Sequence, residues 1–452
     1  MQNNLKTFLD KLFINSWVYF YTIDNLFNKI VIFCWGYILE VSTIDRWCQL
    51  RKSNKLFFYF RKFSDINKVY KYINNEKNYF ENKKIWLIIK LILKYENIIY
   101  NLFVKQNKWF FKNIFKKINI NKKILFILKW GGLEEIIEKS FISFCNFNNI
   151  DLTVLYKFWT WYWWQKLNQD WFFNELKINN PNIKFLYNKD FDDNFIDNIV
   201  RENTEIFSFQ YDYKWKYKNL NMIILSSVTD TKIDCNRYKN IFSSYKSKSI
   251  WYSTDEFINY DNTNIYKIFN AQDIELLNNY SIILDINECV LSWWMDWARD
   301  FSILNWLKWK YKWVMISDEK QNIEWFLDMY RGIQSYYWFF WAFKLSKFFI
   351  ACHLEKYNDD DRSKMIATSI CCWKPVIIPY NDWEIVKTVL KNKLWITYKN
   401  WDKKDLFEKV EYFYNNKEIL EEYSKNCLNY SSKNMDINKF INLIFEKTFN
   451  AR

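Results

Sequence analysis

The chain has 452 residues, of which 50% are hydrophobic and 26% are charged, and its formal net charge is +14. This length and apolar content exclude global disorder and predict two or three domains, each with its own core. Nine Cys without a CxxC pair exclude a disulfide framework and a CxxC zinc site, so we expect the reduced thiols of a cytoplasmic protein.

Residues 1–120 form the first predicted region, and they are strongly basic. They carry 21 Lys and Arg against 8 Asp and Glu, so nearly all of the net charge lies here. Apolar stretches alternate with Lys-rich ones, and Ile85–Val104 has the pattern of an amphipathic helix. The asymmetry indicates an anionic partner, either lipid headgroups or nucleic acid, with a solvated basic face as the alternative. No fold is predicted for this extension.

Neither a cleavable signal peptide nor a membrane span is expected. Met1–Asp10 is polar, and the apolar stretch that follows it carries Asp24 and Lys29. The run Ile85–Val104 contains two Lys and one Glu, which do not suit the hydrocarbon core of a bilayer.

Residues 121–285 are predicted to form a first Rossmann-like domain, which would hold the acceptor. An apolar strand begins at Lys122, and Gly131 and Gly132 form a turn before a helix over Leu133–Phe144. A glycine turn at a helix N-terminus can hold an anion, so both glycines are candidates for an acceptor or phosphate contact; a packing role is equally compatible. Further strands are predicted at Asp151–Tyr156, Ile183–Tyr187, Glu205–Gln210 and Met222–Ser226.

Residues 286–430 repeat this alternation, and residues 431–452 are predicted to form a C-terminal helix. The alternation predicts an α/β protein with two Rossmann-like domains facing a cleft. Strands are expected at Cys289–Ser292, Trp313–Ser317, Lys347–Cys352 and Pro375–Pro379, and helices at Phe301–Leu307, Ile366–Cys372 and Asp405–Asn415.

Tryptophan stands where turns usually have glycine. The chain has 26 Trp and 4 Gly, whereas glycine normally supplies roughly 7% of residues. A bulky residue in the left-handed region costs about 1–2 kcal/mol, which glycine avoids. We hypothesise that the gene uses UGA for glycine; the alternative is an aromatic-rich protein that stacks single-stranded bases. The turn-like dipeptides are Asp170-Trp171, Asp296-Trp297, Asn305-Trp306, Asp382-Trp383 and Asn400-Trp401.

Several segments match known motifs once Trp is taken as Gly. Cys372–Ile378 then contains Gly-Lys-Pro-Val-Ile, Asn381–Val386 resembles a Gly-Gly-x-x-Glu-x-Ile loop, and Leu291–Phe301 becomes Leu-Ser-Gly-Gly-Met-Asp-Gly-Ala-Arg-Asp-Phe. Leu394–Ile396 and Asn400–Asp402 resemble an Asn-Gly-x-Leu-Val and Gly-Asp pair. This stretch of roughly 130 residues resembles the C-terminal domain of GT-B glycosyltransferases, particularly glycosyltransferase family 4.

The resemblance implies a site for a nucleotide-diphosphate sugar at the carboxyl ends of the strands. Backbone must come close to phosphate there, so Trp293 and Trp294 would be the glycines of the donor loop. Arg299 and Lys364 suit cations that bind the diphosphate and stabilise it as it leaves, although each could be a solvated surface charge. Further donor contacts are implied at His353, Thr368, Asp382, Trp383 and Glu384.

Two departures from the family bear on mechanism. The family commonly has a spaced pair of glutamates before Gly-Lys-Pro, and Thr368 takes the later place while Asp360 falls near the earlier one. His353 is the only histidine, so an inverting mechanism would need a carboxylate base, for which Glu134 and its neighbour Glu135 are candidates. A retaining mechanism needs no such base and is favoured.

The sequence therefore predicts a glycosyltransferase of the hexosyltransferase type that acts on a cell-envelope glycan or a lipid-linked acceptor. We expect no cofactor, no metal and no nucleic-acid partner, and a cytoplasmic location at the inner face of the cell membrane through residues 1–120. The alternatives are a non-catalytic binding protein with the same fold and a basic, aromatic nucleic-acid-binding protein. Donor hydrolysis separates the first alternative from the enzyme.

Overall fold

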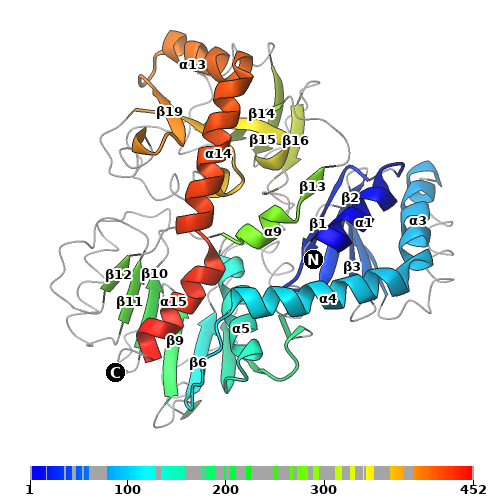
Figure 1. Cartoon of the computed structure of the whole chain (residues 1–452), viewed down its shortest axis with the longest axis vertical. Coiled ribbons are helices and arrows are strands. Elements are labelled where there is room, and N and C mark those ends of the chain that lie inside the picture. Colours follow the sequence, from blue (N-terminus) through cyan, green and yellow to red (C-terminus); the bar gives the residue numbers. More distant parts are fainter. Residues whose placement is uncertain are drawn as a thin grey trace. The chain divides into compact units, whose positions relative to one another are not determined.

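The computed structural model of the chain divides into two compact units (Figure 1). Unit 1 contains residues 1–117, 170–179 and 275–285, and unit 2 contains residues 118–169, 180–274 and 286–452. The structure describes residues 3–16, 18–34, 37–42, 47–52, 55–60, 79–128, 134–157, 179–188, 204–209, 220–224, 249–252, 265–267, 272–282, 289–294, 311–317, 326–330, 343–350, 367–380 and 390–449, and positions 173, 176, 177, 198, 199 and 340.

Unit 1 is built on an antiparallel sheet in which sequential strands are neighbours. The turn between the first two strands is closed by Asp24, whose carboxylate accepts hydrogen bonds from the backbone N–H groups of Leu26 and Phe27. A short strand from far along the chain, β13 (Ser281–Ile282), pairs with β1, so β13 forms one edge of the sheet and the last sequential strand forms the opposite edge. The sequential strands are β1 (Phe20–Asp24), β2 (Lys29–Cys34), β3 (Tyr37–Ser42), β4 (Trp47–Lys52) and β5 (Lys55–Phe60).

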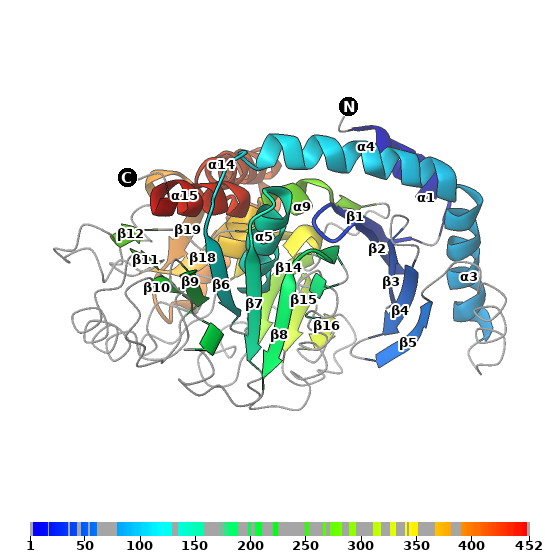
Figure 2. The ribbon, with the colours of Figure 1, turned by 90° about the horizontal axis from the view of Figure 1, so that it is seen from below.

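Three helices of unit 1 bury their apolar faces in one core with this sheet (Figure 2): α1 (Asn3–Phe13), α3 (Tyr79–Lys94) and α4 (Glu96–Ile114). A helix predicted over Ile85–Val104 is thus two helices, which meet at Tyr95. The ring of Tyr95 packs edge-on against Phe8 of α1, with ring centroids 5.8 Å apart. The break lets both helices direct apolar side chains into the same core.

The first Rossmann-like domain of unit 2 has a parallel seven-stranded sheet in the order β12-β11-β10-β9-β6-β7-β8. Strand β6 is a continuous apolar run, as expected for an interior strand of a parallel sheet that is covered on both faces. Helix α5 (Glu134–Phe147) follows β6, as predicted. The strands are β6 (Lys123–Leu128), β7 (Leu152–Lys157), β8 (Lys184–Asn188), β9 (Thr204–Phe209), β10 (Leu220–Ile224), β11 (Ser249–Tyr252) and β12 (Ile265–Lys267).

The second Rossmann-like domain has a parallel six-stranded sheet in the order β16-β15-β14-β17-β18-β19. Numbered within the domain, this order is 3-2-1-4-5-6, the usual order of a Rossmann sheet. The predicted α/β class with two Rossmann-like domains is confirmed. The strands are β14 (Cys289–Trp294), β15 (Lys312–Ser317), β16 (Phe326–Tyr330), β17 (Ser346–Ile350), β18 (Val376–Pro379) and β19 (Trp395–Tyr398).

The last helices link the two domains of unit 2. α13 (Lys403–Asn415) covers the second sheet, α14 (Lys417–Asn434) follows it, and α15 (Ile437–Phe449) returns to pack on α5 (Figure 1). Phe445 of α15 stacks on Phe144 of α5, with ring centroids 4.4 Å apart. The chain therefore crosses between the domains twice. No helix in the described part is both long and apolar enough to span a bilayer.

Candidate functional site

Each parallel sheet of unit 2 reverses its strand order at one point. The reversal lies between β6 and β9 in the first sheet and between β14 and β17 in the second. In open α/β sheets, ligands bind outside the carboxyl ends of the strands at such a switch point. The loops that leave β6 and β14 are therefore where the fold is suited to hold a ligand.

The predicted donor loop begins at the second switch point. Trp293 and Trp294 are the last two residues of β14, where they pair with Ile316 and Ser317 of β15. Arg299 follows five residues later in the sequence and lies outside the described residues. The topology thus places the start of the predicted donor loop at the carboxyl edge of the switch strand.

Other predicted donor residues follow the neighbouring strands. His353 comes three residues after β17, and Asp382, Trp383 and Glu384 come soon after β18. Because β14, β17 and β18 are adjacent and parallel, the loops that carry these residues leave the same edge of the sheet. These four residues and Lys364 lie outside the described residues, so the structure fixes only the edge from which their loops start.

The first switch point carries the predicted glycine turn. Gly131 and Gly132 follow β6 and lie outside the described residues, and Glu134 is the first residue of α5. The predicted order of strand, glycine turn and helix therefore falls at a place in the sheet where ligands bind in this class of fold.

Thr368 lies in a buried polar contact rather than at an exposed edge. It belongs to the helical segment before β18, and its side chain is 1% exposed. Its hydroxyl accepts a hydrogen bond from Nε2 of Gln272, at 3.3 Å. Gln272 belongs to the segment that links the two Rossmann-like domains, so Thr368 ties the second domain to this linker.

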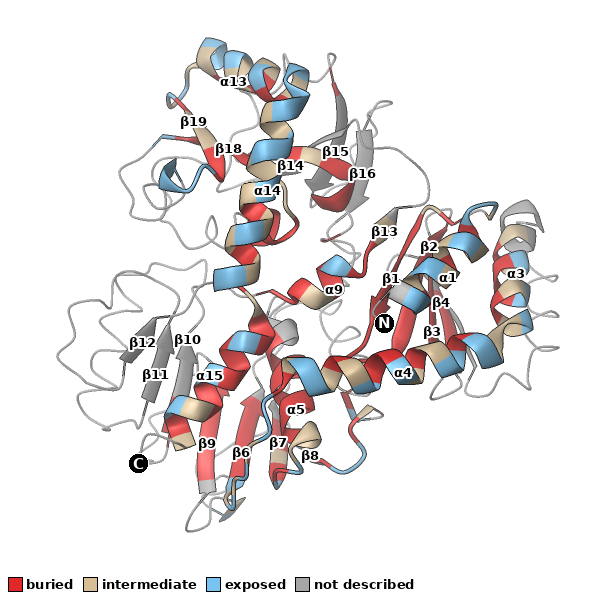
Figure 3. Ribbon diagram, in the orientation of Figure 1, coloured by how far each residue is buried: buried red, intermediate tan, exposed pale blue. Residues whose placement is uncertain are grey.

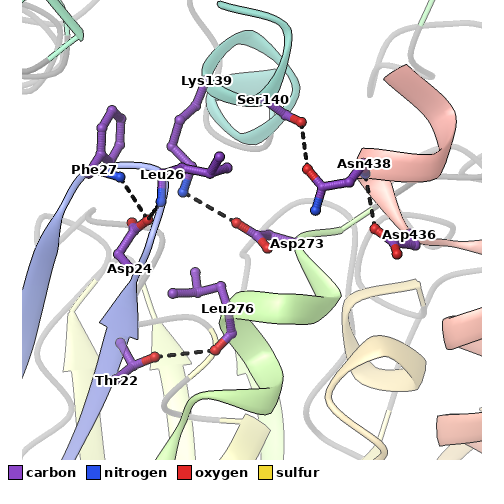
Figure 4. A network of polar contacts seen from close by, with 10 residues as sticks. All are labelled: Thr22, Asp24, Leu26, Phe27, Lys139, Ser140, Asp273, Leu276, Asp436 and Asn438. Atoms are coloured by element: carbon purple, nitrogen blue, oxygen red, sulfur yellow. Dashed lines mark hydrogen bonds and ion pairs between the residues drawn. The ribbon is translucent and has the colours of Figure 1, made fainter. Parts of the chain in front are cut away.

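The two crossings between the domains are hydrogen-bonded to each other. The backbone N–H of Gln272 donates to the carbonyl of Met435, and the N–H of Ile437 donates to the carbonyl of Gln272, both at 2.9 Å. Next to this bridge, the ammonium of Lys139 on α5 lies 3.4 Å from the Asp273 carboxylate, and both side chains are almost fully buried (Figure 4). A buried ion pair of this kind costs most when one partner is removed.

Asp436, the residue before α15, belongs to the same network. Its carboxylate accepts a hydrogen bond from the backbone N–H of Asn438 at 2.9 Å, and Ser140 of α5 donates to the Asn438 side chain at 2.9 Å (Figure 4). Burial, together with the nearby charge of Asp273, raises the pKa of the Asp436 carboxyl to about 6. Sequence reasoning missed this network; its local signal is the charged pair Glu138 and Lys139 between apolar residues of α5.

The turn before β18 has Trp in a glycine position. The helix that contains Thr368 ends with two hydrogen bonds, from Lys374 N–H to the Ser369 carbonyl and from Trp373 N–H to the Ile370 carbonyl, both at 2.9 Å. These are the two bonds of a Schellman motif, in which the residue at the position of Trp373 adopts a left-handed conformation and is usually Gly. Trp373 indeed has φ 63°.

A second Trp has the same backbone conformation. Asp402 N–H donates to the Lys399 carbonyl at 3.0 Å, which closes a four-residue turn with Trp401 in its third position at φ 63°. A positive φ at that position marks a type II turn, where glycine is the usual residue. Asp402 then caps α13 by accepting hydrogen bonds from the next N–H groups. Of the five predicted Asn-Trp and Asp-Trp turns, only this one lies within the described residues.

In the part of this domain that the structure describes, two indole rings leave their N–H groups without an acceptor. The ring nitrogens of Trp373 and Trp395 are buried and have no hydrogen-bond partner among the described residues. A buried indole N–H normally finds an acceptor, and leaving a buried donor unsatisfied costs about 1–3 kcal/mol. The positive φ of Trp373 and its unsatisfied ring nitrogen are both unfavourable for a tryptophan at this position.

The described thiols offer no competing site. Cys371 and Cys372 lie in the buried helix end before Trp373, and burial raises the pKa of the Cys372 thiol to about 12. Such thiols are inert at neutral pH. Within the described residues there is also no group of three or more His, Cys, Asp or Glu that could hold a metal ion.

Comparison with known proteins identifies the fold. No protein-family model and no curated protein sequence matches the chain. Solved structures do: a glycosyltransferase from Rickettsia africae matches with a TM-score of 0.54 and 12% identity, over 74% of this chain and 100% of that one. Anabaena HepE in complex with UDP-glucose matches with a TM-score of 0.51 and 12% identity, over 74% of this chain and 100% of that one. The N-terminal domain of Candida albicans trehalose-6-phosphate phosphatase matches with a TM-score of 0.51 and 9% identity, over 74% of this chain and 98% of that one.

The chain therefore has the GT-B glycosyltransferase fold, which confirms the resemblance seen in the sequence. The identities are low, so these likenesses establish the fold and leave the reaction to be tested. About a quarter of the chain has no counterpart in the matched structures, a share close to the size of unit 1.

Proposed function

We propose that the protein is a glycosyltransferase that moves a sugar from a nucleotide-diphosphate sugar to an acceptor. The observation that carries this proposal is the start of the predicted donor loop, Trp293 and Trp294, at the carboxyl end of the switch strand β14. Anabaena HepE, which has the same fold, has been solved with UDP and with UDP-glucose, and this supports a nucleotide-sugar donor.

Arg299 and Lys364 are the proposed diphosphate cations. A guanidinium can bind two phosphate oxygens at once, and fixed positive charge at the leaving diphosphate lowers the barrier. His353, Thr368 and the segment Asp382–Glu384 complete the proposed donor contacts. Thr368 is the weakest member of this set, because its hydroxyl already bonds Gln272.

We propose a retaining reaction in which the enzyme mainly orients the donor and stabilises the departing diphosphate. An inverting reaction would need a general base, and Glu134 at the start of α5 is the candidate. Gly131 and Gly132, at the first switch point, would contact the acceptor or a phosphate. The proposed acceptor is a cell-envelope glycan or a lipid-linked saccharide, met at the cytoplasmic face of the membrane.

Nucleotide release from a panel of UDP- and GDP-hexoses tests the reaction. The protein should be made from a gene with glycine codons at the Trp positions, since the donor loop requires them. Arg299→Ala should lower the rate by about 100-fold or more, the usual effect of removing one charge-stabilising donor. Lys404→Ala, an exposed lysine of α13, is the matched control and should leave the rate unchanged. Equal rates for Arg299→Ala and the parent would contradict the proposal.

A non-catalytic binding protein is the second candidate. Thr368 occupies the place of a family glutamate and bonds Gln272 of the linker, which favours a fold that has lost a donor contact. Such a protein would bind a nucleotide sugar in calorimetry and release no nucleotide over many hours. Turnover with any donor of the panel excludes it.

We also propose that glycine stands at positions 293, 294, 373 and 401 in the protein made by its own cell, through UGA read as glycine. The support is the left-handed backbone of Trp373 and Trp401 and the unsatisfied ring nitrogen of Trp373. Glycine adopts this conformation without steric cost. Peptide mass spectrometry of the native protein decides the matter, because intact Trp in the peptides that span residues 373 and 401 would reject the proposal.

A further inference from the structure

The exposed charges of unit 1 have one sign. Among its side chains whose burial the structure describes, every exposed charged residue is a lysine. Two of its described carboxylates have partners within the unit: Glu40 pairs with Lys29 at 2.9 Å inside the core, and Asp10 accepts hydrogen bonds from Tyr21 and Ser281. The exposed lysines are Lys11, Lys90, Lys94, Lys105, Lys108, Lys112, Lys116, Lys117 and Lys177.

Helix α4 presents three of these lysines on one face. Ile99, Phe103 and Phe110 form its buried stripe. Lys105, Lys108 and Lys112 follow one another at intervals of three and four residues, so they share the opposite, exposed side. Figure 3 shows buried and exposed bands alternating along α4. None of the ion pairs in the described part uses these three ammonium groups.

Apolar side chains are exposed on the same pair of helices. Leu87 on α3 is 50% exposed, and Ile98 and Tyr100 on α4 are 46% and 40% exposed. On α3, Leu87 is followed by Lys90 and Lys94 at helical spacing, so lysine and leucine share a face there. A surface that mixes lysine with exposed aliphatic and aromatic side chains is what an interfacial helix offers to lipid headgroups.

We propose that the α3–α4 face, defined by Leu87, Lys90, Lys94, Ile98, Lys105, Lys108 and Lys112, docks on a membrane surface rich in anionic lipid. The lysines attract the phosphate headgroups, and the apolar side chains enter the boundary between headgroups and acyl chains. The exposed Leu87 and Ile98 favour lipid over nucleic acid, because a phosphodiester backbone offers them no apolar partner. The proposal concerns unit 1 and does not depend on the sugar-transfer reaction.

Vesicle sedimentation with the full chain tests the charge. Removing Lys105, Lys108 and Lys112 together as Gln should weaken binding to vesicles of phosphatidylglycerol and phosphatidylcholine by about 100-fold, since each basic residue near an anionic surface contributes about fivefold. Exposed lysines on helices of unit 2 provide the matched control: Lys404, Lys425 and Lys433 changed to Gln should leave binding within about twofold. Equal losses in the two triple variants, or no loss in the first, would overturn the proposal.

The apolar part needs a separate variant. Leu87→Ser with Ile98→Ser should remove the vesicle binding that remains at high salt, because screening removes the lysine contribution and leaves the apolar one. Both side chains are half exposed, so the fold should tolerate the change, and circular dichroism checks this.

A 30-base-pair DNA duplex is the competing ligand: binding to DNA without binding to anionic vesicles would reject the proposal that this face docks on a membrane. Donor hydrolysis in solution should be the same in all these variants, so a failure of docking is distinct from a failure of the proposed reaction.

Discussion

The two Rossmann-like domains end a helix in the same way but with different residues. In the first domain, α5 is followed by Ile150 N–H donating to the Cys145 carbonyl and Asn149 N–H donating to the Asn146 carbonyl. Asn149 has φ 54°. The helix before β18 in the second domain closes with the same pair of bonds, but its left-handed residue is Trp373.

This difference shows whether backbone geometry or side-chain packing explains which residue stands at the left-handed helix end. Asn is the residue besides Gly that commonly takes a left-handed helix end, so the first domain obeys the usual rule. In the second domain the backbone makes the same demand and the side chain violates it. A residue chosen for packing would be expected to satisfy its own polar group, yet the Trp373 ring nitrogen is buried without a partner among the described residues.

The largest expected loss of stability comes from the ion pair between α5 and the linker that joins the two Rossmann-like domains. Lys139→Met removes the ammonium from the buried Asp273 carboxylate and should lower the free energy of unfolding by about 3–5 kcal/mol. Because the pair joins α5 to the interdomain linker, we also expect two unfolding transitions instead of one. Urea unfolding followed by circular dichroism measures both.

The matched control for this change is the double variant Lys139→Met with Asp273→Asn. It removes both charges, so most of the lost stability should return. If the single and double variants are equally unstable, then lost packing rather than charge explains the effect, and the linker pair does not couple the domains.

Asp436 at the second crossing gives a smaller effect that depends on pH. Its pKa is raised to about 6 in the folded protein, so the folded state holds this proton more tightly than the unfolded state. Its contribution to stability is present at pH 4 and is lost as the pH rises to about 6. Asp436→Asn should therefore stabilise by up to about 3 kcal/mol at pH 7 and by almost nothing at pH 4.

Denaturant titrations of Asp436→Asn and its parent at both pH values measure this difference. The amide keeps an oxygen that can accept from Asn438 N–H, so the start of α15 is preserved. Asp402→Asn at the start of α13 is the control for replacing a capping carboxylate. An equal gain at pH 4 and pH 7 would show that the Asp436 charge is not the cause.

Nine of the thirteen described strands of unit 2 were predicted from the sequence to within two residues at their ends, whereas β11, β12, β16 and β19 were not predicted. A parallel sheet is covered on both faces, so its strands are short, continuous apolar runs, and β6 is a clear case. The meander of unit 1 could not be predicted. β1 and β2 are also buried throughout, and the charged residues Asp24 and Lys29, which end β1 and begin β2, mark the turn but not the pairing of the strands. The break at Tyr95 has no Gly or Pro to mark it.

The candidate site was predictable only where local motifs carry it. Trp293 and Trp294 were predicted as a loop directly after a strand that ends at Ser292, and the structure instead extends this strand, β14, through Trp294. The partner of Thr368 could not be foreseen, since Gln272 lies 96 residues away and only the fold brings the two together. Lys139 and Asp273 pose the same difficulty.

The comparison of helix ends itself can be tested by exchanging the residues. Trp373→Gly should stabilise the protein by about 1–2 kcal/mol, because glycine takes a left-handed φ without the steric cost of a bulky side chain. Asn149→Trp should destabilise by a similar amount, and Asn149→Gly should change stability only slightly, because Asn and Gly both adopt the left-handed conformation at a helix end. Thermal and urea unfolding of the three variants provide the measurement.

The sign of the Trp373→Gly effect decides between the two explanations. If the indole were a well-packed part of the core, its truncation would cost about 3–5 kcal/mol, far more than the relief of backbone strain. Trp401→Gly isolates the backbone contribution, because Trp401 has the same φ but its side chain is 53% exposed and has little packing to lose. A gain at position 401 together with a large loss at position 373 would mean that Trp373 belongs to the core, and the glycine proposal would then fail at the position where the two domains are compared.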